Sequence, residues 1–261
     1  MYLGGSNEPP SAYEQIGLQH AQAIQPLNAN GQPDAHGKIV MLSIGMSNAT
    51  LEFQEFIREA NADPQKNPNL ELVDGAVSGQ DAETIKNPNA TYWTIVDHRL
   101  ANASATNEQV QSIWLKEAIE RPTESFPVDA QHLQNDLAAI VEILRQRFPN
   151  LQIIYLASRT YAGYATTNLN PEPYAYESGF AVKGLIIAHM TNDPTSGPWL
   201  AWGPYLWTDG LRGRSDGLVW TCDDVQSDGT HPSASGQQKV AGLLLDFFES
   251  DPTAIGWFIS Q

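Results

Sequence analysis

Short apolar runs that alternate with amphipathic stretches are the feature that most constrains the fold of this chain. The clearest pair is a stretch over 129–148, with apolar residues at helical spacing and Asp129 as the expected N-cap, followed by a continuous apolar run over 151–156. A run that is apolar at every position is typical of a parallel strand covered on both faces. The same alternation predicts further strands at 39–44, 70–73 and 109–115, and further helices at 49–60, from 82 onward, at 174–189 and at 237–248.

Strands separated by helical crossovers predict an α/β protein, a three-layer α/β/α sandwich with a mainly parallel central sheet. Residues 1–36 are rich in Pro, Asn, Gln and Gly, with one weakly helical stretch around 13–24, and we expect an N-terminal arm packed on the domain. Neither a repeat nor a low-complexity linker divides the rest. A single domain over 37–261 is therefore predicted, which suits a chain of 261 residues.

The balance of charges excludes several classes of partner. The chain has 14 Lys and Arg against 30 Asp and Glu, a formal net charge of −16. Nucleic acids and anionic membranes attract basic surfaces, so we expect neither as a partner. No run approaches the roughly 18 apolar residues of a membrane span. A small-molecule or carbohydrate substrate remains open, and the sequence does not indicate an oligomeric state.

The single cysteine, Cys222, permits no disulfide within the chain and no cysteine-based zinc site. Asp223 and Asp224 beside it would raise the pKa of its thiol, which argues against a cysteine nucleophile. The first residues lack the basic and apolar regions of a signal peptide. We expect either a cytoplasmic protein or a secreted or periplasmic one whose leader is not part of this chain.

Polar residues and glycines follow several predicted strands directly. Ser47, Gly79, Lys116 and the segment 158–161 all stand in such positions. In open parallel sheets the binding site lies outside the carboxyl ends of the strands. These residues are therefore predicted to meet at one edge of the sheet.

The segment 228–231, Asp-Gly-Thr-His, places a carboxylate three residues before an imidazole. At this spacing Asp228 can fix the tautomer of His231 and stabilise the ring once it takes a proton. The alternative is a helix-entry turn in which the histidine only caps the helix. Asp223 and Asp224 compete as orienting carboxylates, but their spacing to the histidine is less suitable.

Ser47 is the candidate nucleophile for this pair. A serine hydroxyl needs a neighbouring imidazole as general base, and the oxyanion that forms needs hydrogen-bond donors held in place beforehand. Ser47, His231 and Asp228 are therefore predicted to form a triad for acyl transfer, with the backbone N–H groups of Ser47 and Gly79 as oxyanion donors. The alternative for Ser47 is a helix N-cap.

Taken in order, these segments resemble the blocks of the SGNH (GDSL-type) hydrolase superfamily. Residues 45–48, Gly-Met-Ser-Asn, resemble its first block, although the usual Gly-Asp-Ser is here Gly-Met-Ser. Ser-Asn is closer to the carbohydrate-esterase branch. Residues 77–79, Val-Ser-Gly, resemble the second block, whose glycine donates to the oxyanion, and 228–231 resemble the last. The resemblance spans about residues 38–248 and implies the flavodoxin-like SGNH hydrolase fold.

The third block departs from the family pattern. The family supplies an Asn side chain after its third strand, whereas here the strand leads into Trp114-Leu-Lys116-Glu117 without one. Lys116 stands where the carbohydrate-esterase branch often has Gln. A lysine held by Glu117 could stabilise an oxyanion by its charge, so Lys116 is the candidate third donor. The alternative is an ion pair at a strand end.

Several residues are candidates for substrate contact. The segment 197–207 has four aromatic residues interleaved with Gly and Pro, which predicts a rigid loop. Its rings could stack on sugar rings, or they could form a lid packed on the core. The candidate substrate-binding residues are Asn48, Arg159, Tyr161, Trp199, Trp202 and Trp207.

Together these features predict a serine esterase that removes short acyl groups, with acetyl as the expected one, from a carbohydrate. The mechanism requires no cofactor, and no ligand cluster in the sequence calls for a metal. One alternative is a catalytically weak carbohydrate-binding protein on the same fold, suggested by the altered third block. Another is a lipase or thioesterase of the same superfamily, which would need a long apolar groove.

Overall fold

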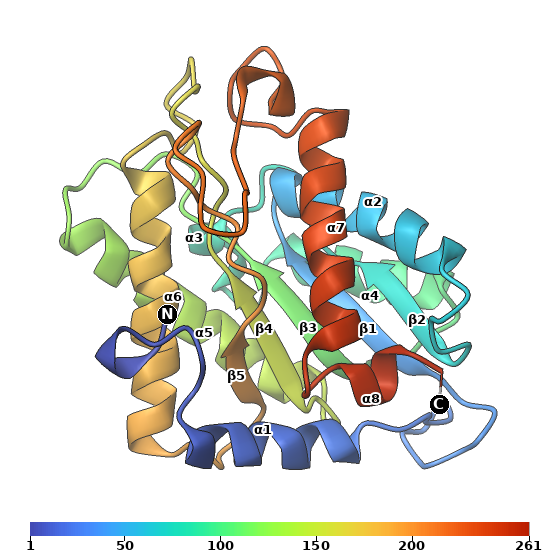
Figure 1. The fold of residues 1–261 in the computed structure, drawn as a ribbon. Helices are drawn as coiled ribbons and strands as arrows, with labels where there is room; N and C mark the ends of the chain where they lie inside the picture. Colours follow the sequence, from blue (N-terminus) through green and yellow to red (C-terminus); the bar gives the residue numbers. More distant parts are fainter. Residues whose placement is uncertain (261) are drawn as a thin grey trace.

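A five-stranded parallel sheet forms the centre of the computed structural model, which describes residues 1–260 (Figure 1). The strand order is β2-β1-β3-β4-β5. The strands are β1 (Ile39–Gly45), β2 (Leu70–Asp74), β3 (Val110–Lys116), β4 (Ile153–Ala157) and β5 (Trp199–Trp202). The predicted α/β sandwich with a parallel sheet is confirmed.

Two layers of helices cover the sheet. Helices α2 (Ser47–Ala62) and α7 (Ala234–Ser250) pack together on one face, and α5 (Val128–Arg147) and α6 (Tyr174–Asn192) pack together on the other (Figure 1). Because both faces are covered, β1, β3 and β4 are buried at every position. The shorter helices are α3 (Ala82–Ile85), α4 (Thr91–Asn102) and α8 (Ile255–Phe258), with 3₁₀ turns at Leu3–Gly5, Asn107–Gln109 and Cys222–Asp224.

The N-terminal segment crosses the amino-terminal end of the sheet. Its helix α1 (Ser11–Ala23) lies below the strands in Figure 1, while the loops over 158–173 and 203–233 rise above their carboxyl ends. The hydroxyl of Tyr13 in α1 donates a 2.6 Å hydrogen bond to the Leu200 carbonyl oxygen of β5. This contact places the segment against the sheet, whereas the division of the chain into an arm and one domain stays a prediction.

Two local predictions are wrong. The Trp-rich segment is not a loop throughout, because Trp199–Trp202 forms the edge strand β5, paired parallel to β4. All four residues of β5 are buried, and a short run that is apolar at each position is itself a strand pattern. Asp129, expected to cap α5, lies in its first turn instead, where its carboxylate still complements the helix dipole, and Pro127 holds the N-cap position.

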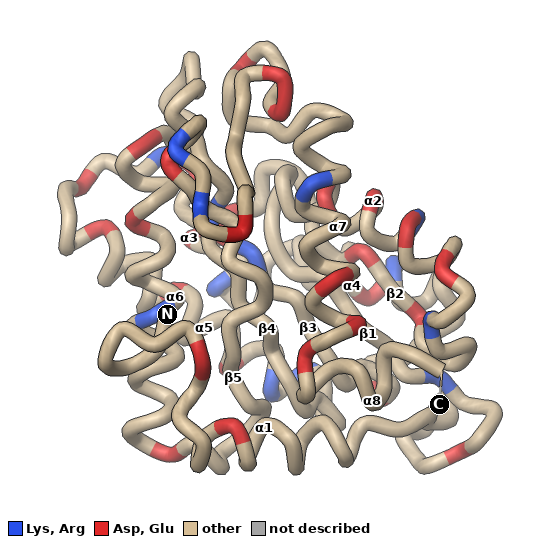
Figure 2. The backbone as a smooth tube through the Cα atoms, viewed as in Figure 1, with Lys and Arg blue, Asp and Glu red and all other residues tan. Residues whose placement is uncertain are grey.

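No helix within residues 1–260 combines the length and the hydropathy that a bilayer span requires. Acidic positions are distributed over most elements, and the few basic positions are scattered among them (Figure 2).

Candidate active site

The order of the strands places a crevice beside β1. The chain passes from β1 to β2 on one side and returns to β3 on the other, so the direction of winding switches at this point. Open α/β sheets bind ligands outside the carboxyl ends of the strands at such a switch. Ser47 begins α2 directly after β1, and Gly79 lies in the turn that follows β2. Both residues therefore lie at the crevice.

Close packing at the end of β1 sets the position of Ser47. A Cβ atom on Gly45 would lie 2.2 Å from the Lys116 carbonyl oxygen and 2.6 Å from the Ala49 side chain, so only glycine fits there. Met46 takes the N-cap position, and Ser47 is the first residue of α2. The first N–H groups of a helix have no partner within it and carry partial positive charge. The Ser47 N–H is therefore suited to an oxyanion.

The Asp228 turn is folded around its own carboxylate. One carboxylate oxygen of Asp228 accepts hydrogen bonds of 3.0 Å from the backbone N–H groups of Thr230 and His231. Gly229 has φ +69°, and a Cβ atom there would lie 1.8 Å from the Tyr164 carbonyl oxygen. A glycine is required on both counts. The turn leaves the second carboxylate oxygen free to meet the histidine ring.

A chain of hydrogen bonds joins the three residues of the predicted triad. Asp228 Oδ2 lies 2.5 Å from His231 Nδ1, and His231 Nε2 lies 2.8 Å from Ser47 Oγ. Burial disfavours the charged carboxylate, but the hydrogen bonds from the His231 ring and from the two N–H groups outweigh it and hold the pKa of Asp228 below its usual value. Asp228 is therefore anionic at neutral pH and orients the ring.

Asn48 connects the serine to this turn. Its side chain is buried, with 2% relative exposure, and its amide Nδ2 donates a 2.9 Å hydrogen bond to the Thr230 carbonyl oxygen. The amide nitrogen therefore already has a hydrogen-bond partner within the protein. Asn48 is not among the residues that line the pocket at Ser47, and its contact with substrate stays a prediction; what the structure gives it is a contact that positions the turn.

A pocket of about 350 Å³ opens beside the serine. A Cβ atom on Gly79 would have no neighbour within 4 Å, so this glycine borders open space. The structure thus brings Ser47, His231 and Gly79 to one pocket. Its lining residues are Met46, Ser47, Leu51, Ser78, Gly79, Glu120, Leu169, Gln226 and His231.

Lys116 does not reach this pocket, contrary to the predicted role as third oxyanion donor. Its ammonium group lies 2.6 and 2.5 Å from the two carboxylate oxygens of Glu52, in a pair whose side chains are 2% and 0% exposed. Burial lowers the pKa of Lys116 to about 8 and raises that of Glu52, although each partner opposes the shift of the other. Glu117 was expected to hold Lys116, but its Oε1 accepts from the Ala118 N–H.

The other predicted contact residues lie outside the pocket. Trp199 and Trp202 are largely buried in the strand β5, not carried by a loop, and neither lines this pocket. Arg159 is also buried, at 3% relative exposure, and its backbone N–H donates to Ser178 Oγ. Tyr161 and Trp207 remain half-buried, with ring centroids 6.3 Å apart.

Asp224, one of the two competing carboxylates, has structural partners of its own. Asp224 Oδ2 accepts a 2.6 Å hydrogen bond from Lys239 of α7 and also binds Thr221, so it anchors the entry to that helix. Asp228 is the carboxylate that meets the histidine. Within residues 1–260 no group of three or more His, Cys, Asp or Glu side chains is arranged to hold a metal ion.

Sequence reasoning missed part of the pocket wall. Ser78 and Glu120 follow β2 and β3 closely, so the rule that sites lie at carboxyl ends could have found them. Leu169 and Gln226 come from long loops, and no local pattern indicates where such loops fold. Leu51 was missed as well, because its neighbours on α2 face the core and the helical pattern does not set it apart from them.

Comparison with known proteins gave no matching family model and no matching curated protein. Among solved structures, the chain is similar to a catalytic mutant of an acetylxylan esterase from Geobacillus stearothermophilus, with 14% identity and a TM-score of 0.48 over 85% of this chain and 97% of that one. It is also similar to a GDSL-like lipase from Bacteroides thetaiotaomicron, with 10% identity and a TM-score of 0.44 over 90% of this chain and 95% of that one.

Proposed function

We propose that this protein is a serine esterase that hydrolyses short acyl esters, acetyl above all, carried by a carbohydrate. The observation that carries the proposal is the hydrogen-bonded chain from Asp228 through His231 to Ser47, which ends at an open pocket. A serine within 2.8 Å of an imidazole that is itself oriented by a carboxylate has the arrangement of an activated nucleophile.

In the proposed mechanism Ser47 Oγ attacks the ester carbonyl carbon while His231 Nε2 takes the hydroxyl proton. The tetrahedral intermediate then expels the alcohol, which receives that proton, and an acyl-serine remains. A water molecule attacks the acyl group with His231 again as base, and the carboxylic acid leaves as Ser47 is restored. Asp228 keeps Nδ1 protonated and stabilises the imidazolium at both stages.

Two backbone groups are proposed to hold the oxyanion. The Ser47 N–H is at the N-terminus of α2, where the helix dipole favours negative charge. Gly79 lines the same pocket, in a turn with φ +71° and open space beside it, and we propose its N–H as the second donor. Lys116 has no part in the proposed mechanism, because its ammonium group is enclosed with Glu52.

The walls of the pocket favour a short acyl group. Its volume of about 350 Å³ is near the lower end for small-molecule sites. Leu51, Leu169 and Met46 supply apolar surface for an acetyl or similar group. A carbohydrate is the preferred alcohol because it is neutral, and a protein with a formal charge of −16 repels anionic substrates.

The deciding experiment is covalent labelling with a fluorophosphonate probe, followed by peptide mapping. We expect the probe to modify Ser47, and Ser47→Ala to lose both labelling and hydrolysis of p-nitrophenyl acetate. Ser78→Ala is the matched control, because its hydroxyl lines the same pocket and labelling at Ser47 should persist. Hydrolysis by Ser47→Ala at the wild-type rate would refute the proposal.

A further inference from the structure

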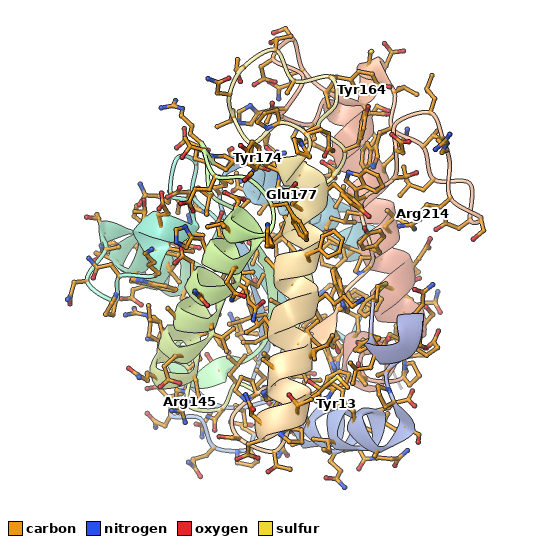
Figure 3. All side chains as sticks on the ribbon, turned by 90° about the vertical axis from the view of Figure 1, so that its left-hand side faces the viewer. Tyr13, Arg145, Tyr164, Tyr174, Glu177 and Arg214 are labelled. Carbon is orange, nitrogen blue, oxygen red and sulfur yellow. The ribbon has the colours of Figure 1, made fainter. Side chains whose placement is uncertain are left out.

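A second and larger hollow lies away from the proposed triad. Its volume is about 820 Å³, and it is bordered by the N-terminal segment, α6 and the loop that follows β5. Figure 3 looks onto this face, with α6 along its length and the loop that carries Arg214 beside it. The hollow shares no lining residue with the pocket at Ser47. Aromatic side chains supply much of its wall, among them Tyr2, Tyr176, Phe180, Trp202 and Tyr205.

Two of these rings are exposed on α6. Tyr176 and Phe180 are each 40% exposed and stand one helical turn apart, with ring centroids 5.4 Å from each other. Gly179 stands beside them and adds no side chain to this surface. A Cβ atom there would have Tyr205 Oη as its nearest neighbour, at 3.7 Å. Phe126, 50% exposed, continues the exposed rings with a centroid 5.2 Å from that of Phe180. Exposed apolar surface of this kind marks binding sites on soluble proteins.

The rings continue toward the proposed active site. Tyr176 lies 4.5 Å from Trp207, Trp207 lies 6.3 Å from Tyr161, and Tyr161 lies 5.3 Å from Tyr164, all between ring centroids. The Tyr164 backbone packs on Gly229, next to the carboxylate of the triad. We call Phe126, Phe180, Tyr176, Trp207, Tyr161 and Tyr164 the aromatic row. Figure 3 shows Tyr164 beyond the amino-terminal end of α6, where Glu177 is labelled.

Polar groups accompany the aromatic row. Glu172 Oε1 accepts a 2.9 Å hydrogen bond from Trp207 Nε1 and so fixes the orientation of that ring. The Arg214 guanidinium lies 5.6 Å from the centre of the Tyr205 ring and forms an ion pair with Asp216. Lys183 and several carboxylates line the same hollow. The surface thus combines flat apolar ring faces with basic and acidic side chains that can form hydrogen bonds.

We propose that the large hollow and the aromatic row bind a neutral polysaccharide and hold it beside the proposed catalytic pocket. Sugar rings have apolar faces and hydroxyl edges, which match aromatic platforms bordered by polar groups. The net charge of −16 disfavours polyanions and anionic membranes. The inference rests on the proposed function only for the choice of ligand, because the surface itself lies outside the triad pocket.

The test is affinity electrophoresis in native gels that contain soluble xylan, galactomannan or hydroxyethylcellulose, with polygalacturonate as the anionic comparison. The Ser47→Ala protein is used throughout, so that binding is measured without hydrolysis and does not depend on the proposed chemistry. We expect at least one neutral polymer to retard the protein. The double variant Tyr176→Ala/Phe180→Ala should weaken this binding at least tenfold.

Matched variants keep the test decisive. Ile255→Ala removes an apolar side chain of similar exposure, 37%, from α8 and should bind as the parent does. Phe126→Ser, at the exposed end of the aromatic row, gives a second variant if the double variant unfolds, and it should weaken binding as well. Absence of retardation by all three neutral polymers, or equal retardation of the row variants and the parent, would overturn the proposal. Sedimentation that shows a dimer abolished by the double variant would overturn it in favour of a protein interface.

Discussion

The side-chain amide of Asn48 donates a 2.9 Å hydrogen bond to the carbonyl oxygen of Thr230. Together with the bond between His231 and Ser47, this contact joins the helix that begins with Ser47 to the turn that contains Asp228 and His231. The two bonded residues are 182 positions apart in the sequence. The distance between the serine hydroxyl and the histidine ring therefore depends on a residue that touches neither.

Removal of this amide should impair turnover more than substrate binding. In Asn48→Ala we expect kcat for p-nitrophenyl acetate to fall roughly 10- to 100-fold with little change in KM, since a displacement of about 1 Å can cost about 100-fold. Asn69→Ala is the matched control, because Asn69 Nδ2 donates to the Gly37 carbonyl oxygen far from the site. Equal losses in both variants would show that Asn48 has only a general structural effect.

Asp228→Asn should leave the fold in place and disable the histidine. The amide cannot stabilise the imidazolium, and it can favour the wrong tautomer of the ring, so kcat should fall by roughly 10³–10⁴. The measurement is steady-state hydrolysis together with the rate of fluorophosphonate labelling. Asp224→Asn changes a carboxylate of the same region that binds Lys239 instead. A similar loss of labelling in that variant would contradict the assignment of Asp228.

The sequence predicts the meeting of Ser47, His231 and Asp228 because this arrangement follows from local rules. The carboxyl ends of parallel strands meet at one edge, which brings Ser47 after β1 and Gly79 after β2 together. The Asp228–His231 pair is formed within one tight turn, so its spacing alone is informative. Where only local spacing or strand order is needed, a single sequence is sufficient.

Lys116 shows where such reasoning fails. Every position of β3 is buried, so the strand has no alternation from which to infer the direction of a side chain. The partner of Lys116 is Glu52, 64 residues away on α2, and no local pattern connects them. The prediction of a loop over 197–207 is wrong for a related reason. The four apolar residues of β5 fit a strand, but Gly and Pro flank them, and only the pairing with β4, a contact between distant segments, decides the matter. Both errors concern long-range packing.

The buried pair gives a prediction that separates stability from catalysis. Lys116→Met alone leaves an unpaired buried carboxyl group and should reduce the free energy of unfolding by about 3–5 kcal/mol. The double variant Lys116→Met/Glu52→Met should recover most of that loss, as urea denaturation would show. Its kcat should stay within a few fold of the wild-type value. A loss of about 100-fold or more in a folded double variant would restore Lys116 as an oxyanion donor.

The lowered pKa of Asp228 predicts a pH dependence of stability. Burial opposes the shift, but hydrogen bonds from the His231 ring and from the two backbone N–H groups prevail, so the folded pKa lies below the unfolded value of about 3.9. Between these two pKa values the unfolded chain binds more protons, and stability rises with pH. The contribution is therefore complete above about pH 5 and is lost as the pH falls through the folded pKa. Urea denaturation of wild type and Asp228→Asn should give a difference in unfolding free energy that shrinks as the pH falls from 5 toward 3. A difference that stays constant down to pH 3 would show that these hydrogen bonds do not favour the ionised carboxylate.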